Sequence, residues 1–138
     1  MKIEIYSDGS GNTMEGDGGW AYRIIVDDSV VAECSGYLDN ATNNVAELYG
    51  AVEGLKEAIA LTVNKLDTKE YTLYSDSKLV LGYANGSYAC KAEHLLPLYI
   101  KIRELYTLIN LKTVWVKGHS GNTHNEACDK LAKAARKR

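Results

Sequence analysis

The spacing of apolar residues along the chain predicts strands first and helices afterwards. Two isoleucines alternate with polar residues over positions 2–6, which predicts a first strand that ends at Ser7-Asp8-Gly9. Two more strands are predicted at residues 20–26 and 30–37. The Asp27-Asp28 pair between them is typical of a tight turn, so these two strands should form a β-hairpin.

Apolar residues then recur every three or four positions over residues 44–62, which predicts a long amphipathic helix. The remaining elements are a strand at 71–75, a short helix at 77–83, a helix at 95–109 interrupted early by Pro97, a strand at 113–117 and a helix at 123–136. This order, βββαβααβα, predicts an α/β fold with a five-stranded mixed sheet and helices on both faces. With 138 residues the chain should form a single domain, 1–138.

The composition is that of an ordinary globular domain. No signal sequence precedes the first strand pattern and no apolar run approaches membrane-spanning length, so we expect a soluble, cytoplasmic protein with no membrane partner. The three cysteines, Cys34, Cys90 and Cys128, have unrelated spacings that fit neither a disulfide framework nor a zinc site. They are interpreted as reduced structural thiols.

The charges are distributed unevenly along the chain. Residues 1–57 hold eleven acidic against three basic residues, whereas residues 58–138 hold seven acidic against thirteen basic residues. The segment from Lys130 to Arg138 is strongly basic. This asymmetry indicates either an acidic site facing a basic docking surface or a basic tail that serves solubility.

Four carboxylates each have a local structural explanation. Asp8 could be a turn residue before glycine, and Asp76 could cap the helix that follows it. Glu47 could complete a capping box that begins at Asn44. Asp129 could pair with the lysine four residues later on its helix. Taken singly, each position favours the structural explanation.

Taken together, the four positions predict a metal site. Asp8 and Asp76 fall at the carboxyl ends of strands that should lie side by side, where ligands collect in open α/β sheets. A helix start and a second helix could each direct one more carboxylate into the same crevice. Converging carboxylates require cations or proton uptake. Oxygen ligands without Cys or His suit Mg²⁺ or Mn²⁺, and two such ions are used for phosphodiester displacement.

Four segments carry a family resemblance in their order along the chain: "YSDGSG", "TNNVAEL", "YSDS" and "VKGHSGNTHNEACDKLA". Together they resemble type 1 ribonuclease H over nearly the whole chain, and the last segment is the most specific. The resemblance implies a ribonuclease H-like fold. It also implies that Asp8, Glu47, Asp76 and Asp129 are the metal-binding and catalytic carboxylates, with a flexible histidine, His119, beside them.

Other residues of the last segment have separate interpretations. His119 could shuttle a proton or assist product departure, because imidazole titrates near neutral pH; the alternative is an exposed loop histidine. Thr123-x-x-Glu126 is a capping box, which we favour over a catalytic role for Glu126. His124 should lie at the surface, in the first turn of the last helix, and Cys128 should pack in the interior.

The resemblance implies endonucleolytic hydrolysis of the RNA strand of an RNA/DNA hybrid, leaving 3′-hydroxyl and 5′-phosphate ends. Two Mg²⁺ ions would serve as cofactors, with Mn²⁺ as a substitute, and we expect a monomer with little base-sequence specificity. Asn12, Asn43 and Asn44 are candidates for contacts with 2′-hydroxyls, because RNA is distinguished by these groups in the minor groove. Thr42 and Lys78 are candidates for DNA-strand phosphates. Loop or capping roles are the alternatives for all five.

The chain departs from the family pattern in two places. The first loop, "SGNTMEGDGGW", lacks the proline-containing turn of many members, and "GYANGSYACKAEHLLPLYIKIREL" lacks their basic handle. Substrate would then be held by scattered bases such as Lys78, Lys91, Lys117 and the 130–138 segment, which predicts weak binding. Rival interpretations are a non-catalytic hybrid-binding module and a nuclease domain of a reverse transcriptase. The complete carboxylate set favours an enzyme.

Overall fold

The computed structural model describes residues 1–11, 16–118 and 121–137. The elements, in chain order, are β1 (Lys2–Gly11), β2 (Gly18–Val26), β3 (Ser29–Leu38), α1 (Asn43–Thr62), β4 (Glu70–Ser75), α2 (Lys78–Asn85), the 3₁₀ turn η1 (Glu93–Leu95), α3 (Leu96–Leu108), β5 (Leu111–Trp115) and α4 (Thr123–Lys137). The predicted order βββαβααβα is confirmed.

The five strands form one mixed sheet in the order β3-β2-β1-β4-β5. β1, β2 and β3 pair antiparallel, whereas β4 is parallel to both β1 and β5. The predicted hairpin turn is confirmed: Asp27 and Asp28 have φ angles of 47° and 72°, which is the left-handed geometry of a two-residue turn between twisted strands. The central position of β1 places its carboxyl end in the middle of the sheet edge.

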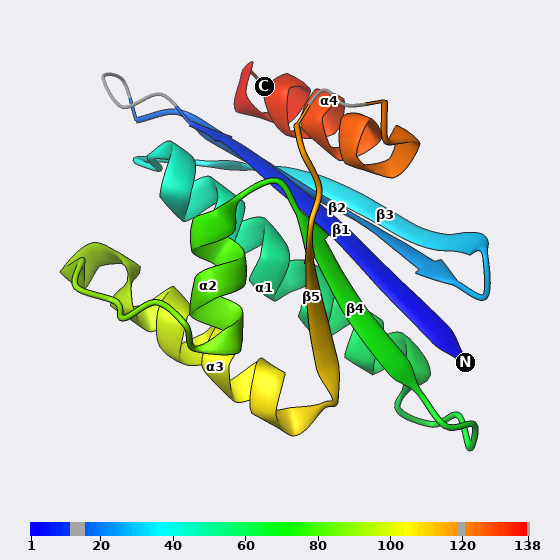
Figure 1. Cartoon of the computed structure of the whole chain (residues 1–138). Helices are drawn as coiled ribbons and strands as arrows, with labels where there is room; N and C mark the ends of the chain where they lie inside the picture. Colours follow the sequence, from blue (N-terminus) through cyan, green and yellow to red (C-terminus); the bar gives the residue numbers. More distant parts are fainter. Residues whose placement is uncertain (12–15, 119–120, 138) are drawn as a thin grey trace.

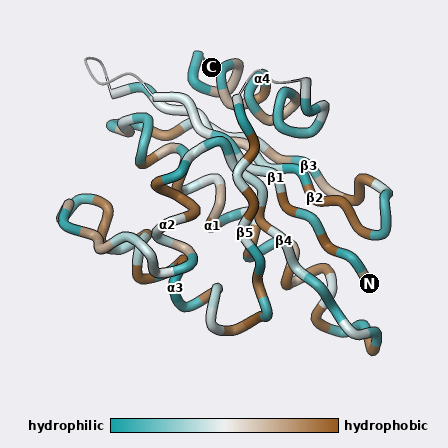
Figure 2. Tube along the Cα trace, viewed as in Figure 1, coloured by the Kyte–Doolittle hydropathy of each residue, from teal (hydrophilic) through white to brown (hydrophobic). Residues whose placement is uncertain are grey.

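Helices cover both faces of the sheet, as predicted. α1, α2 and α3 lie on one face and α4 lies on the other (Figure 1). The main core is formed between the sheet and α1, where Ile5, Leu48, Leu55 and Leu73 are fully buried. Figure 2 shows hydrophobic stretches along β1 and β2, whereas α4 is mostly hydrophilic. None of the helices in the described part of the chain is both long and apolar enough to span a membrane.

Most predicted boundaries differ from the observed ones by one or two residues, and three of the differences bear on the site or on helix geometry. β1 continues through Asp8 to Gly11, because its antiparallel pairing with β2 extends that far. β5 lies two residues earlier than predicted, at Leu111–Trp115, where it pairs with β4. Pro97 was expected to interrupt a helix, which is wrong. It lies in the first positions of α3, where its missing N–H costs nothing, and the preceding residues form η1 instead.

The connection between α2 and α3 is short. Gly86 ends α2 in the left-handed conformation, with a φ of 82°, and residues 87–92 lead directly into η1. No helix is inserted in this described segment, which agrees with the absence of a basic handle from the sequence.

Candidate active site

Asp8 and Asp76 lie side by side at the carboxyl edge of the sheet. β1 and β4 are parallel, and each aspartate follows the last paired residues, Tyr6 and Tyr74, by two positions. The parallel register therefore brings the two carboxylates to the same level, so the predicted meeting of Asp8 and Asp76 at one edge is confirmed, although Asp8 lies within β1 and not after it. Asp8 is only 4% exposed, and its Oδ1 accepts a hydrogen bond of 2.8 Å from the N–H of Gly9.

Two glycines of β1 allow the start of α1 to lie directly against the strand. A Cβ atom on Gly9 would lie 2.1 Å from the backbone N of Glu47, and one on Gly11 would lie 2.4 Å from the backbone N of Asn43. Real Cβ atoms do not approach backbone so closely, so any other residue at Gly9 must push α1 away. This contact brings Glu47 beside Asp8. No prediction from the sequence included this contact, although the small residues of "SDGSG" were the available signal.

Glu47 does not cap its helix, so the predicted capping box from Asn44 to Glu47 is wrong. The N-cap of α1 is Thr42, whose hydroxyl accepts from the N–H of Val45 at 3.3 Å. α1 therefore begins one residue earlier than predicted, and Glu47 lies beyond the position from which a side chain can reach back to the cap. Its Oε1 accepts instead from Asn43 Nδ2 at 3.3 Å.

Asp76 does not cap α2 either. The N-cap is Ser77, whose hydroxyl accepts from the N–H of Val80 at 3.2 Å. The indole Nε1 of Trp115 donates to the backbone carbonyl of Asp76 at 3.1 Å, which ties the end of β5 to this turn. Sequence reasoning did not identify Trp115. Trp115 lies in the middle of the strand predicted at 113–117, so nothing in the sequence pointed to this contact.

The three carboxylates converge. One oxygen from each of Asp8, Glu47 and Asp76 lies within 4.8 Å of the other two. Burial, followed by the charge of Asp76, raises the pKa of Asp8 to about 8, although the Gly9 hydrogen bond opposes the rise. The same two causes raise the pKa of Glu47 to about 7, against a hydrogen bond from Ser77. The folded chain thus holds protons on groups that are ordinarily ionised at neutral pH.

Asp129 lies close enough for its charge to contribute to the raised pKa of Asp8. Its Oδ2 also forms an ion pair of 3.1 Å with Nζ of Lys133, so the pair expected from the i,i+4 spacing is present. Asp129 is not part of the three-residue carboxylate cluster described above. Its predicted role as a fourth metal ligand stays a prediction.

The cluster has the chemistry of a divalent-cation site. Its donors are carboxylate oxygens from β1, α1 and the turn after β4, without thiolate or imidazole ligands. Hard oxygen donors of this kind suit Mg²⁺ or Mn²⁺. A bound cation would neutralise the carboxylates and so replace the protons that the cluster otherwise holds.

Several predictions concern the segment before α4. His119, and likewise Asn12 in the loop between β1 and β2, lie outside the described residues, and their roles stay predictions. The expected capping box of Thr123 and Glu126 is wrong, because the side chain of Asn122 accepts from the N–H of Asn125 at 2.9 Å and so caps the helix.

The two remaining predictions for α4 had different outcomes. His124 lies in the first turn of α4 as predicted, but it is half-buried and not at the surface, with Nδ1 3.1 Å from Nη1 of Arg23 and its ring 5.0 Å from that of Tyr6. Cys128 packs in the interior as predicted, with its thiol donating to the Tyr6 carbonyl at 3.5 Å. Burial raises the pKa of this thiol to about 12.

The structure describes four of the five candidate substrate residues, which lie at the starts of α1 and α2. Thr42 is the helix cap, and the Oδ1 of Asn43 accepts from the N–H of Gly11 at 3.2 Å, so Asn43 links β1 to Glu47. Asn44 is exposed in the first turn of α1. The Nζ of Lys78 lies 4.7 Å from the centre of the Trp115 ring.

Comparisons with known proteins agree with this fold and site. The family model for RNase H matches residues 1–137. The chain is 33% identical to a ribonuclease H from Treponema denticola, covering 96% of this chain and 95% of that protein. It is also 36% identical to one from Campylobacter jejuni, covering 96% and 90% of the two chains.

Two solved structures are similar along nearly their whole length. The N-terminal RNase H domain of a Mycobacterium tuberculosis protein has a TM-score of 0.84 at 30% identity, covering 99% of this chain and 94% of that one. LC11-RNase H1, solved in complex with an RNA/DNA hybrid, has a TM-score of 0.84 at 26% identity, covering 98% and 96%.

The mixed sheet carries an acidic cluster at the carboxyl ends of its parallel strands, and nucleases match the chain along nearly its whole length. Together these features define a hydrolase. The chain belongs to the ribonuclease H family, in its type 1 form. It is therefore a ribonuclease, and its family implies dependence on a divalent metal ion.

Proposed function

We propose that this protein cleaves the RNA strand of RNA/DNA hybrids endonucleolytically with two divalent metal ions, leaving 3′-hydroxyl and 5′-phosphate ends. The observation that carries the proposal is the convergence of Asp8, Glu47 and Asp76 within 4.8 Å. Family membership adds support, as does the hybrid bound by LC11-RNase H1. We further propose that the enzyme is a cytoplasmic monomer that uses Mg²⁺, or Mn²⁺ as a substitute.

The carboxylates would hold the metal ions. Asp8, Glu47 and Asp76 supply oxygens from three different elements, and Asp129 adds a fourth from α4. Divalent ions held by these residues would supply a lowered pKa for an attacking water and stabilisation of the leaving 3′ oxygen. Asp8 is buried, and its carboxylate is fixed by the N–H of Gly9. It could therefore hold a metal ion in place without reorganising during the reaction.

The remaining residues would orient substrate and move protons. His119 would shuttle a proton or assist product departure, the role that the family resemblance implies for it, since imidazole ordinarily titrates near neutral pH. Asn12, Asn43 and Asn44 would contact 2′-hydroxyls and so select RNA, and Thr42 and Lys78 would bind phosphates of the DNA strand. None of these contacts reads a base edge in the major groove, so little sequence specificity is expected.

A cleavage assay on three matched duplexes tests the proposal: an RNA/DNA hybrid, an RNA duplex and a DNA duplex, each with Mg²⁺. We expect cleavage of the RNA strand of the hybrid alone, with products that carry 5′-phosphates. Excess EDTA should abolish the reaction. Undiminished cleavage in EDTA, or equal cleavage of duplex DNA, would overturn the proposal.

A further inference from the structure

The exposed side of α4 carries a row of lysines that begins beside the fourth carboxylate. α4 packs on the sheet through Asn125, Cys128 and Ala132, which define its inner face. Asp129, Lys133 and Lys137 follow at intervals of four residues, and side chains at this spacing lie above one another on one side of a helix. The line therefore leads from Asp129 directly along the helix.

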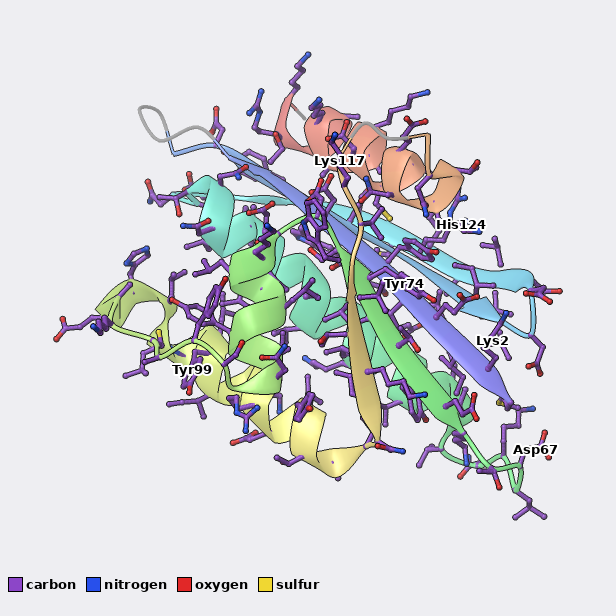
Figure 3. All side chains as sticks on the ribbon, in the orientation of Figure 1. Lys2, Asp67, Tyr74, Tyr99, Lys117 and His124 are labelled. Carbon is purple, nitrogen blue, oxygen red and sulfur yellow. The ribbon has the colours of Figure 1, made fainter. Side chains whose placement is uncertain are left out.

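Lys130 widens this line on the solvent side. It lies one helical turn before Lys133 and is exposed, as is Lys137. We call Lys130, Lys133 and Lys137 the α4 basic row. Figure 1 shows α4 alone on its face of the sheet, and Figure 3 shows nitrogen-tipped side chains that extend outward from it.

Two of the three lysines are not neutralised by a neighbouring acid within the described part of the chain. Lys133 pairs with Asp129, but Lys130 and Lys137 form no ion pair with any residue that the structure describes. A base at the carboxyl end of a helix, such as Lys137, also interacts favourably with the helix dipole. Lys130 lies in the middle of α4, where the dipole effect is absent, so the dipole does not account for the row.

We propose that the α4 basic row binds the phosphate backbone of the hybrid whose scissile phosphate lies at the carboxylate cluster. This inference rests on the proposed function and names a second contact surface for the same substrate. A polyanion suits the row because the row is cationic. The hybrid is the polyanion expected there, because the row starts at Asp129, beside the proposed cleavage site. From Asp129 to Lys137 the helix rises ~12 Å at 1.5 Å per residue. That length matches about three or four nucleotides of one strand at ~3.4 Å each.

The row also explains how a chain of net charge −2 without an inserted basic helix can hold a polyanion. The carboxylate cluster repels phosphate until cations neutralise it. Unpaired lysines on the neighbouring helix supply attraction that depends on neither metal nor base sequence, and the counterions that they release drive binding.

Binding measured across a salt series tests the row. Lys130→Gln/Lys137→Gln is made in an Asp76→Asn background, so that hybrid stays intact during titration. The matched control, Lys65→Gln/Lys112→Gln, removes the same charge at the opposite end of the sheet, where α1 ends and β5 begins. We expect the log–log salt slope to become shallower by about 1.8, which is ~0.9 for each phosphate that a lysine no longer neutralises. The Kd should rise about tenfold or more at low salt, and the control should keep the parental slope.

Kinetics and stability complete the test. With Asp76 intact, the α4 double variant should raise KM and leave kcat nearly unchanged, since such contacts form equally in ground and transition states. A salt slope equal to that of the control would overturn the proposal, as would a lowered melting temperature with unchanged Kd. If the parent chain cleaves no hybrid, the proposed function fails, but the binding slopes still decide whether the row holds nucleic acid.

Discussion

Replacing Asp8 by Asn should stabilise the metal-free protein while it abolishes cleavage. Burial and the neighbouring carboxylates raise the pKa of Asp8 from 3.8 to about 8. The folded chain therefore binds this proton more tightly than the unfolded chain does, and unfolding releases it between about pH 4 and pH 8. By linkage, the stability contribution is fully present below pH 4 and is lost as the pH rises toward 8.

The size of the effect follows from the same pKa. One pKa unit corresponds to ~1.4 kcal/mol, so the rise from 3.8 to about 8 means that the ionised Asp8 opposes folding by at most ~6 kcal/mol above pH 8. Glu47 and Asp76 share the repulsion with Asp8, so we expect the variant to gain about half of that or less, ~2 kcal/mol. For a chain of this length, that gain raises the melting temperature by about 6 °C. Asn keeps the Oδ1 that accepts from Gly9, so the turn should be preserved.

Thermal unfolding in EDTA at pH 5, 6, 7 and 8 measures the prediction. The variant should exceed the parent most at pH 8, and the difference should shrink as the pH falls. Asp67→Asn, which removes a carboxylate from an exposed loop at the far end of the molecule (Figure 3), should change nothing. Millimolar Mg²⁺ should reverse the order, because binding to the folded state stabilises only a chain with an intact site. A variant less stable than the parent in EDTA at pH 8 would refute the reasoning.

Three further substitutions test the site. Asp76→Asn should lower cleavage by orders of magnitude, because it removes a charge that would hold metal. It should leave the fold and hybrid binding intact, because Ser77 and not Asp76 caps α2, and unfolding of the variant in a circular dichroism melt would contradict this. His119→Ala should lower kcat by about 100-fold or less, and a variant as inactive as Asp8→Asn would show that an accessory proton shuttle is the wrong role. Gly9→Ala should cost activity and several kcal/mol of unfolding free energy, measured by urea titration, since its Cβ would meet Glu47 N at 2.1 Å; Ser10→Ala on the same strand is the control.

The architecture and the converging carboxylates could be predicted because they depend on periodicity and on strand ends. Asp8 and Asp76 follow apolar strands, and two parallel strands must bring their carboxyl ends to one edge. The capping assignments failed for a different reason. A cap depends on the backbone of a single residue, and a shift of one position moved the start of α1 to Thr42 and removed the capping role of Glu47.

Contacts between distant segments left almost no trace in the sequence. The approach of α1 to β1 at Gly9 depends on how two elements pack, and a glycine after aspartate is equally typical of a turn. The i,i+4 spacing of Asp129 and Lys133 predicted their ion pair. The spacing alone could not show that the charge of Asp129 also raises the pKa of Asp8.

The raised pKa values of the cluster make metal binding a proton-exchange reaction. Near pH 7, Asp8, with a pKa of about 8, is mostly protonated, and Glu47, with a pKa of about 7, is about half protonated. Metal ligation requires ionised carboxylates, so binding must release protons, and the apparent affinity for Mg²⁺ should rise with pH up to about 8. Calorimetric titration of Mg²⁺ in buffers of different ionisation enthalpy should show about one to two protons released at pH 7 and almost none at pH 9. A binding enthalpy independent of the buffer would mean that the cluster is already ionised without metal. The stabilisation expected for Asp8→Asn would then lose its cause as well.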